Sequence, residues 1–285
     1  MDPIIKLRKQ QIDESANPSE PLRRIEFNIT ELCNRTCWFC PRSDHKIYKN
    51  RGLHMPIEVA MRINGELMTQ HWRDQNLNLS FAGFGEPLLH KQHLEVFAAV
   101  TKGGMHRSEI ITNGDFLNHA KIEEIYKAGI ERIVVNNYES AERGEHYREL
   151  FSDRPREKYH IRDNYEGNMQ LNLTNRAGSA VNVENAVTLP RHRACFIPFY
   201  SLVIDWNGDA ILCGNDWQRQ GLSGLNIMQR SLLDIWQSTE LQAFRDMLMR
   251  DRRDTSPCNA CDIDGQMVGR PSFDWFKGHS EALRK

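Results

Sequence analysis

Residues 33–40 read C-N-R-T-C-W-F-C, and the three thiols in this short loop belong to Cys33, Cys37 and Cys40. The loop follows residues 24–30, whose apolar and polar side chains alternate as in a β-strand. Polar residues surround the cysteines, which argues against a purely packed role. Three thiolates can hold a cubane iron–sulfur cluster and leave one iron open, because the cluster needs four ligands. They can also belong to a zinc site that a nearby side chain such as His45 completes.

Outward from this loop, strand-like and helix-like segments alternate. Strands are predicted at 24–30, 77–84, 108–112 and 132–136, and helices at 56–67, 93–100, 121–128 and 142–151. Two further short strands are predicted at 159–161 and 170–174, too close together for a crossover helix between them. The alternation predicts a parallel sheet with helices outside it. We therefore predict an α/β fold, a partial (β/α)6 barrel of five or six strands with functional residues at their carboxyl ends.

The pattern changes near the carboxyl end of the chain. Residues 200–213 read as two short strands joined by Asn207-Gly208, a strong hairpin signal, and helices are predicted at 232–236 and 241–248. This organisation predicts a small hairpin-plus-helix domain after the barrel. The expected divisions are a flexible lead-in over 1–22, the barrel over 23–190 and the small domain over 191–285.

The composition restricts the class of partner. The chain has 285 residues, a net charge of −1 and a pI near 6.8, which favours neither nucleic acid nor a membrane surface. No secretory signal and no run of about 18 apolar residues is present, so we expect a cytoplasmic protein. Seven cysteines in such a protein are expected to serve metals or catalysis rather than disulfides. We expect a small-molecule substrate, with no nucleic acid and no membrane as partner.

The spacing C-x3-C-x2-C resembles the signature of the radical S-adenosylmethionine (SAM) enzymes. The resemblance implies that Cys33, Cys37 and Cys40 hold a 4Fe-4S cluster whose open iron chelates the amino and carboxylate groups of SAM. It also implies that Phe39, between the second and third cysteines, lies beside the adenine. The alternative for Phe39 is an ordinary apolar contact.

The segment F-A-G-F-G-E-P, residues 81–87, ends the second predicted strand. It resembles the glycine–glutamate motif of the same family, although Phe84 separates the two glycines. The resemblance implies that Gly83, Gly85 and Glu86 receive the methionine amino group of SAM. By itself, a glycine pair at a strand end can be only a turn.

The segment I-I-T-N-G-D, residues 110–115, closes the third predicted strand. It resembles the T-N-G that often meets the SAM sugar in this family, which implies ribose contacts from Thr112 and Asn113. The alternative is a turn in which Asn113 or Asp115 caps the next helix.

Arg176 lies in the segment N-R-A-G-S, residues 175–179, after the last predicted barrel strand. A guanidinium in the barrel mouth can hold a carboxylate or orient a substrate hydroxyl, so Arg176 is the candidate catalytic residue. We assign it orientation only, because a guanidinium keeps its proton and is a poor base. A solvated arginine is the alternative. Asn136 and Asn137 are weaker candidates for the same pocket.

Four cysteines remain, spaced C-x17-C-x44-C-x2-C, namely Cys195, Cys213, Cys258 and Cys261. The spacing resembles the shortened SPASM appendage called a twitch domain, which implies an auxiliary 4Fe-4S cluster with four protein ligands. A structural zinc site also accepts four thiolates. Three and four ligands use all seven cysteines, which leaves no thiol to return a hydrogen atom to a substrate radical and favours oxidation.

By this resemblance we expect a radical SAM oxidoreductase of the dehydrogenase type. Reductive cleavage of SAM would give a 5′-deoxyadenosyl radical that removes a hydrogen atom from an alcohol carbon of a small carbohydrate-like substrate. The auxiliary cluster would accept the remaining electron, and a flavodoxin or ferredoxin would serve as electron donor. The cysteine spacing is similar to that of 2-deoxy-scyllo-inosamine dehydrogenases. The alternatives are a radical SAM epimerase, a peptide-modifying maturase and a non-catalytic zinc-binding module.

Overall fold

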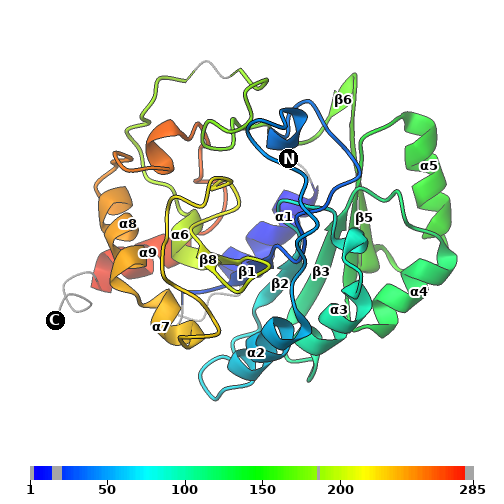
Figure 1. Ribbon diagram of the computed structural model, residues 1–285, viewed down its shortest axis with the longest axis horizontal. Helices are drawn as coiled ribbons and strands as arrows, with labels where there is room; N and C mark the ends of the chain where they lie inside the picture. Colours follow the sequence, from blue (N-terminus) through cyan, green and yellow to red (C-terminus); the bar gives the residue numbers. More distant parts are fainter. Residues whose placement is uncertain (1–2, 15–20, 185–186, 280–285) are drawn as a thin grey trace.

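An eight-stranded sheet organises the computed structural model, which describes residues 3–14, 21–184 and 187–279 (Figure 1). The strands are β1 (Arg24–Phe27), β2 (Asn78–Phe81), β3 (Arg107–Thr112), β4 (Arg132–Asn137), β5 (Tyr159–Tyr165), β6 (Asn168–Met169), β7 (Ser201–Ile204) and β8 (Ala210–Ile211). Their order is β6-β5-β4-β3-β2-β1-β7-β8. The pairs from β5 through β1 to β7 are parallel, whereas β6 and β8 join the two edges antiparallel. The α/β partial barrel is confirmed, and its sixth parallel strand comes from the C-terminal part of the chain.

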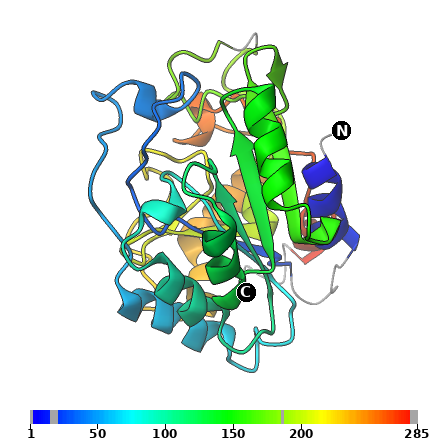
Figure 2. The same ribbon diagram turned by 90° about the vertical axis from the view of Figure 1, so that its right-hand side faces the viewer.

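Helices cover the outside of this sheet (Figures 1 and 2). Each of β1 to β4 is followed by one helix, in order α2 (Ile57–Leu67), α3 (His93–Thr101), α4 (His119–Lys127) and α5 (Ala141–Leu150). The C-terminal region adds α6 (Ile197–Tyr200), α7 (Leu232–Trp236), α8 (Thr239–Met249) and α9 (Arg270–His279). Short 3-10 turns lie at Pro41–Ser43, Pro87–Leu89, Arg156–Lys158 and Cys258–Ala260. None of the described helices has the length and apolar character needed to cross a membrane.

The two faces of the sheet differ in chemistry because successive side chains of a strand point to opposite sides. In β1, Ile25 and Phe27 belong to the main hydrophobic core, while Arg24 and Glu26 line a cavity on the other face. The sheet therefore presents an apolar face to the helices and a polar face to the barrel interior.

The hairpin predicted around Asn207-Gly208 is confirmed. Gly208 has a φ of +89°, which a glycine adopts without steric cost, and β7 pairs with β8 on either side of this turn. β7 also pairs in parallel with β1, so one sheet runs across the division expected at residue 190.

The strand predicted at 170–174 is wrong. β5 continues to Tyr165, and a turn through Gly167, with a φ of +84°, leads back into the short β6. After β6 the chain is held by single hydrogen bonds, such as that from the Leu171 amide to Asn164 Oδ1 (2.9 Å), rather than by a strand ladder. The glycine turn therefore ends the regular sheet at this edge.

The flexible lead-in predicted over 1–22 is wrong for residues 3–14. They form α1 (Pro3–Lys9) and a π-helical turn (Gln10–Glu14). Ile12 is buried, Arg8 pairs with Glu109 (3.2 Å), and Asp13 accepts a hydrogen bond from the Gly269 amide (2.8 Å). These contacts fix the segment against the barrel. Residues 1–2 and 15–20 of the predicted lead-in lie outside the described residues.

Candidate active site

The cysteine loop follows β1 and is held in place by side chains that come later in the sequence. The side chain of Asn50 forms two hydrogen bonds with the backbone of Cys33. Its Oδ1 accepts one from the Cys33 amide (3.1 Å), and its Nδ2 donates one to the Cys33 carbonyl (3.0 Å). The buried Arg42 donates from Nε to the Phe84 carbonyl (2.6 Å). Burial and the two other thiols of the loop raise the pKa of Cys37 to about 12. The loop thus brings three sulfur donors near one another, the ligand type that iron–sulfur clusters take.

The same loop is tied to the segment that follows β3. Asp115 accepts hydrogen bonds from Arg35 Nε (2.7 Å) and Asn34 Nδ2 (2.6 Å). Asn113 donates from Nδ2 to Asn34 Oδ1 (2.8 Å). The cap of the next helix, α4, is Asn118, so neither Asn113 nor Asp115 serves as the helix cap considered from the sequence. The polar residues after β3 instead position the cysteine loop.

Glu86 connects the ends of β2 and β3. Its carboxylate accepts hydrogen bonds from Thr112 Oγ1 (2.7 Å), the Asn113 amide (2.7 Å) and the Leu88 amide (3.1 Å). Burial raises the pKa of Glu86 to about 7, although these three hydrogen bonds act to lower it. These hydrogen bonds therefore join the loop after β2 to the end of β3.

Two positions in the loop after β2 require glycine. Gly83 has a φ of +113°, which favours glycine, and it lines the cavity described in the next paragraph. A Cβ atom at Gly85 would lie 2.7 Å from the Leu32 carbonyl oxygen and closer still to that of Thr30. The backbone of this loop can therefore pass directly against the segment that leads into the cysteine loop.

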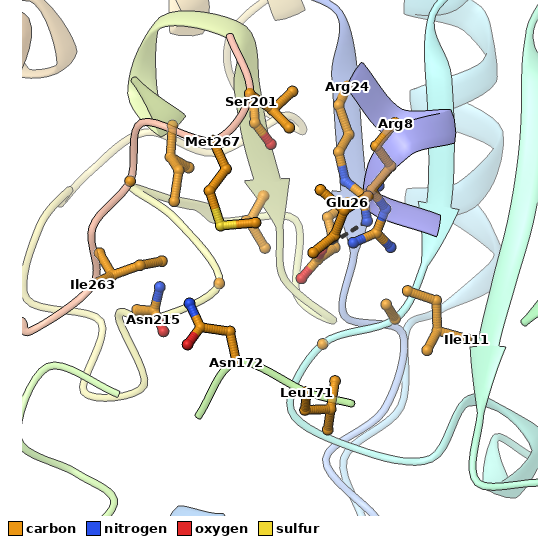
Figure 3. Close-up of a pocket in the computed structure, with 18 of the residues that line it drawn as sticks. Arg8, Arg24, Glu26, Ile111, Leu171, Asn172, Ser201, Asn215, Ile263 and Met267 are labelled. Atoms are coloured by element: carbon orange, nitrogen blue, oxygen red, sulfur yellow. Dashed lines mark hydrogen bonds and ion pairs between the residues drawn. The ribbon is translucent and has the colours of Figure 1, made fainter. Parts of the chain in front are cut away.

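A cavity of about 400 Å³ lies between the polar face of the sheet and the C-terminal region (Figure 3). Phe39 and Tyr138 contact each other at its edge, with ring centroids 5.6 Å apart. Arg176 also lines it and donates from Nη1 to Asn215 Oδ1 (3.2 Å). Both Phe39 and Tyr138 border a second cavity, of about 990 Å³, that reaches Cys37. We call the first cavity the sheet cavity, and these shared residues make it adjacent to the cysteine loop.

Some of the site residues predicted from the sequence line this cavity, and others do not. Phe39, Gly83, Asn136 and Arg176 line it. Gly85, Glu86, Thr112 and Asn113 do not line it. Asn137 does not line it either, since its Nδ2 donates to Asp163 Oδ1 (2.8 Å) and to the Ser140 carbonyl (2.6 Å).

Sequence reasoning missed several polar residues of the cavity, namely Arg8, Arg24, Glu26, Tyr138, Arg162, Asn172, Ser201 and Asn215. Arg24 and Glu26 alternate with apolar residues in β1, which is the pattern of a strand with one solvated face. That signal cannot distinguish a solvated face from the wall of a polar cavity.

The remaining four cysteines, Cys195, Cys213, Cys258 and Cys261, line one small apolar pocket. Gly265 packs against Cys195 so closely that an added Cβ atom would overlap its sulfur. Burial raises the pKa of Cys195 to about 11. In the described part of the chain, no three His, Cys, Asp or Glu side chains already surround a single metal position. Four sulfur donors from four points of the chain nevertheless match the donor set of a fully ligated iron–sulfur cluster.

Comparison with known families agrees with this division of the cysteines. Residues 27–159 match the Radical SAM superfamily, and residues 195–262 match SPASM, an iron–sulfur cluster-binding domain. The first match covers the loop with Cys33, Cys37 and Cys40. The second begins at Cys195 and includes the other three cysteines.

Similar proteins were found by sequence and by structure. The chain is 30% identical over 249 residues to an S-adenosyl-L-methionine-dependent 2-deoxy-scyllo-inosamine dehydrogenase of Niallia circulans, covering 83% of this chain and 91% of that one. It is 30% identical over 123 residues to a GTP 3′,8-cyclase of Aquifex aeolicus, covering 41% and 36%. A crystal structure of BtrN in complex with AdoMet and 2-DOIA superposes with a TM-score of 0.73 and 25% identity, covering 88% and 96%. The chain therefore belongs to the radical SAM superfamily, with a SAM-binding 4Fe-4S cluster, SAM and an auxiliary iron–sulfur cluster as its cofactors.

Proposed function

We propose that this enzyme is a SAM-dependent dehydrogenase that oxidises an alcohol of a small carbohydrate-like molecule to a carbonyl. The observation that carries the proposal is that the sheet cavity is lined by neighbours of both groups of cysteines. Phe39, next to Cys40, and Gly214, next to Cys213, both line it. A substrate in this cavity would be close to both cofactor sites. The similarity to a 2-deoxy-scyllo-inosamine dehydrogenase over most of both chains supports the same reaction class.

We assign the first cluster to Cys33, Cys37 and Cys40 and the auxiliary cluster to Cys195, Cys213, Cys258 and Cys261. When bound, the first cluster with SAM supplies a radical that removes hydrogen, and the auxiliary cluster supplies an acceptor for the remaining electron. The expected domains are the barrel over 23–190 and the cluster-binding part from 191 onward.

The chain's own residues would bind and orient the two organic molecules. Phe39 offers an apolar face to the adenine of SAM, and the backbone at Gly83 can approach SAM closely because the residue has no side chain. Arg176 also lines the cavity, where it can donate to a substrate hydroxyl while Asn215 accepts a hydrogen bond from its guanidinium. Glu86, Thr112 and Asn113 would act indirectly by fixing the loops that carry these contacts.

The first test is the anaerobically purified protein itself. Two 4Fe-4S clusters correspond to about eight irons per chain, with equal sulfide and no stoichiometric zinc. With SAM and either dithionite or a flavodoxin or ferredoxin system, we expect methionine and 5′-deoxyadenosine. Stoichiometric zinc and no SAM cleavage would refute the enzyme and support a zinc-binding module.

The second test separates the possible reactions. Incubation with 2-deoxy-scyllo-inosamine and related cyclitols in deuterated water should give a carbonyl product without deuterium at the reacting carbon. A stereo-inverted alcohol that carries solvent deuterium would instead identify an epimerase. Modification of a peptide with no reaction of any cyclitol or sugar would identify a maturase.

Arg176 provides a test at the level of one side chain. Arg176→Met should lower kcat/KM by about 100-fold, because an oriented charged hydrogen bond to the substrate is lost. Cleavage of SAM without substrate should persist. Arg73→Met, at a half-exposed arginine far along the chain from the cavity, is the matched control. Equal activity of both variants would remove Arg176 from the site.

A further inference from the structure

Positively charged residues outnumber negatively charged ones in the lining of the sheet cavity. Its charged residues are Arg8, Arg24, Arg162, Arg176, Glu26 and Asp264, that is, four guanidinium groups against two carboxylates. Ion-pair partners outside the lining include Glu109, with Arg8 and Arg24, and Arg193, with Asp264. With these two included, the groups are five guanidiniums and three carboxylates.

Two of the four guanidinium groups lie where α1 meets β1, and Glu26 and Glu109 form ion pairs with them. Arg8 and Arg24 both reach Glu109 Oε1, at 3.2 and 3.1 Å, and Arg24 also pairs with Glu26 Oε2 (3.2 Å). Figure 3 shows Arg8, Arg24 and Glu26 grouped at one end of the cavity, with Arg8 reaching in from α1. We call these three residues the cavity floor.

Glu26 and Glu109 balance the charges of Arg8 and Arg24, but Arg24 and Arg162 still repel Arg8. Burial and repulsion from Arg24 and Arg162 lower the pKa of Arg8, although Glu109 opposes the shift. The Nε–H of Arg8 is buried and finds no hydrogen-bond acceptor among the described residues. A buried donor without an acceptor costs free energy, which an anionic ligand would recover.

A substrate amine is the opposite possibility, because Glu26 also lines the cavity. Its carboxylate is already paired with Arg24, and the guanidinium groups outnumber the carboxylates. An ammonium group here would face the repulsion that Arg8 already experiences. An anionic group would instead relieve that repulsion.

We propose that the cavity floor binds an anionic substituent of the substrate, a carboxylate or a phosphate ester, and that α1 contributes Arg8 as a specificity-determining residue. The inference rests on the proposed function, since it concerns the substrate of the same cavity. It departs from the amine-bearing substrate that the name of the 2-deoxy-scyllo-inosamine dehydrogenase indicates for that relative.

The test measures binding to the holoenzyme saturated with SAM, so that the carboxylate of SAM already occupies its own site. Dissociation constants are determined by anaerobic calorimetry for D-glucose, D-glucosamine, D-gluconate and D-glucose 6-phosphate. At least one of the two anions should bind about 10-fold to 100-fold more tightly than glucose, as expected for one charge-assisted contact. The tighter anion distinguishes a carboxylate from a phosphate. Glucosamine as the tightest ligand, or no preference of either anion over glucose, would overturn the proposal.

Substitutions at Arg8 locate the effect. Arg8→Gln should remove most of the preference for the anion, and Arg8→Lys should restore part of it because the charge returns. Lys9→Gln is the matched control, since Lys9 is an exposed cation of the same helix. Cleavage of SAM in the absence of substrate reports correct folding of each variant. A full anion preference in Arg8→Gln, or its loss in Lys9→Gln, would refute the role of Arg8.

The two proposals fail in different ways. Oxidation of a neutral or aminated alcohol with no anion preference would leave the dehydrogenase standing and refute the anion site. Tight anion binding that depends on Arg8, without a carbonyl product from any bound alcohol, would support the anion site and refute the dehydrogenase.

Discussion

Replacement of Arg253 by methionine should weaken the contact between the two segments that flank Cys195 and Cys261 in the auxiliary cluster site. Arg253 is 1% exposed and donates to four backbone carbonyls. The acceptors are Arg193 (3.0 Å), Ala194 (3.1 Å), Ile263 (2.7 Å) and Asp264 (2.9 Å). One guanidinium thus joins the segment just before Cys195 to the segment just after Cys261.

The magnitude follows from these hydrogen bonds. A hydrogen bond from a charged donor contributes about 1.5–3 kcal/mol, but four bonds from one group are not additive, because the freed carbonyls regain some partners. We therefore expect Arg253→Met to lower the free energy of unfolding by about 4 kcal/mol. With a slope near 3 kcal/mol per molar urea, the unfolding midpoint should fall by about 1 M.

The assay combines urea unfolding, followed by tryptophan fluorescence, with iron content after exposure to a chelator. Arg253→Met should also lose iron faster, because its charge helps lower the pKa of Cys195, Cys258 and Cys261 against their burial. Arg252→Met is the matched control, since that side chain is 59% exposed and forms a surface ion pair with Asp254. The control should change stability by less than about 0.5 kcal/mol. Equal midpoints and equal iron loss in the two variants would refute this account of the site.

Two further predictions concern the loop after β2. Gly85→Ala should destabilise the fold by about 2 kcal/mol or more, because its Cβ would press on the backbone carbonyl of Thr30. Gly65→Ala, in the exposed last turn of α2 with nothing within 4 Å, should instead stabilise it by about 0.5–1 kcal/mol. Urea midpoints of the two variants check the pair, and a destabilised Gly65→Ala or a neutral Gly85→Ala would contradict it. Because burial raises the pKa of Glu86 from 4.5 to about 7, the folded protein keeps a proton that the unfolded carboxyl releases, so stability is lost as pH rises from 4.5 to 7. Between pH 6 and pH 8 the natural protein should lose about 1 kcal/mol that Glu86→Gln does not lose, and parallel pH dependences of the two unfolding midpoints would show that Glu86 is not the titrating group.

Local sequence patterns predicted the elements that depend on local geometry. The alternation in 24–30 and the Asn207-Gly208 turn each correspond to a strand or hairpin in the structure. The cysteine loop was recognisable because its three thiols must come from a short segment. By contrast, the strand predicted at 170–174 failed because the glycine turn at Gly167 redirects the chain after β5.

The contacts that could not be predicted are hydrogen bonds and ion pairs between residues far apart in the sequence. The T-N-G motif predicts SAM contacts for Thr112 and Asn113, but it does not indicate that both hydrogen-bond to Glu86, a residue 26 or 27 positions earlier. Arg8 meets Glu109 across 101 positions, and no periodicity in the first 22 residues indicates that contact. A local pattern can identify a polar residue, but it cannot say which distant residue neutralises it.

The motif residues and the charged residues of the cavity differ in what they hold in place. The motif residues are largely bonded to one another, as Glu86 is to Thr112 and Asp115 is to Arg35, so they must be kept together to hold the loops around the cofactors. Four of the six charged residues of the cavity, Arg8, Arg24, Glu26 and Arg162, come instead from α1, β1 and β5, outside the motifs. Such positions can change without disturbing the cofactor loops, because they contact one another on the polar face of the sheet. The cysteine spacing therefore indicates the radical chemistry, whereas the substrate has to be deduced from the lining of the cavity.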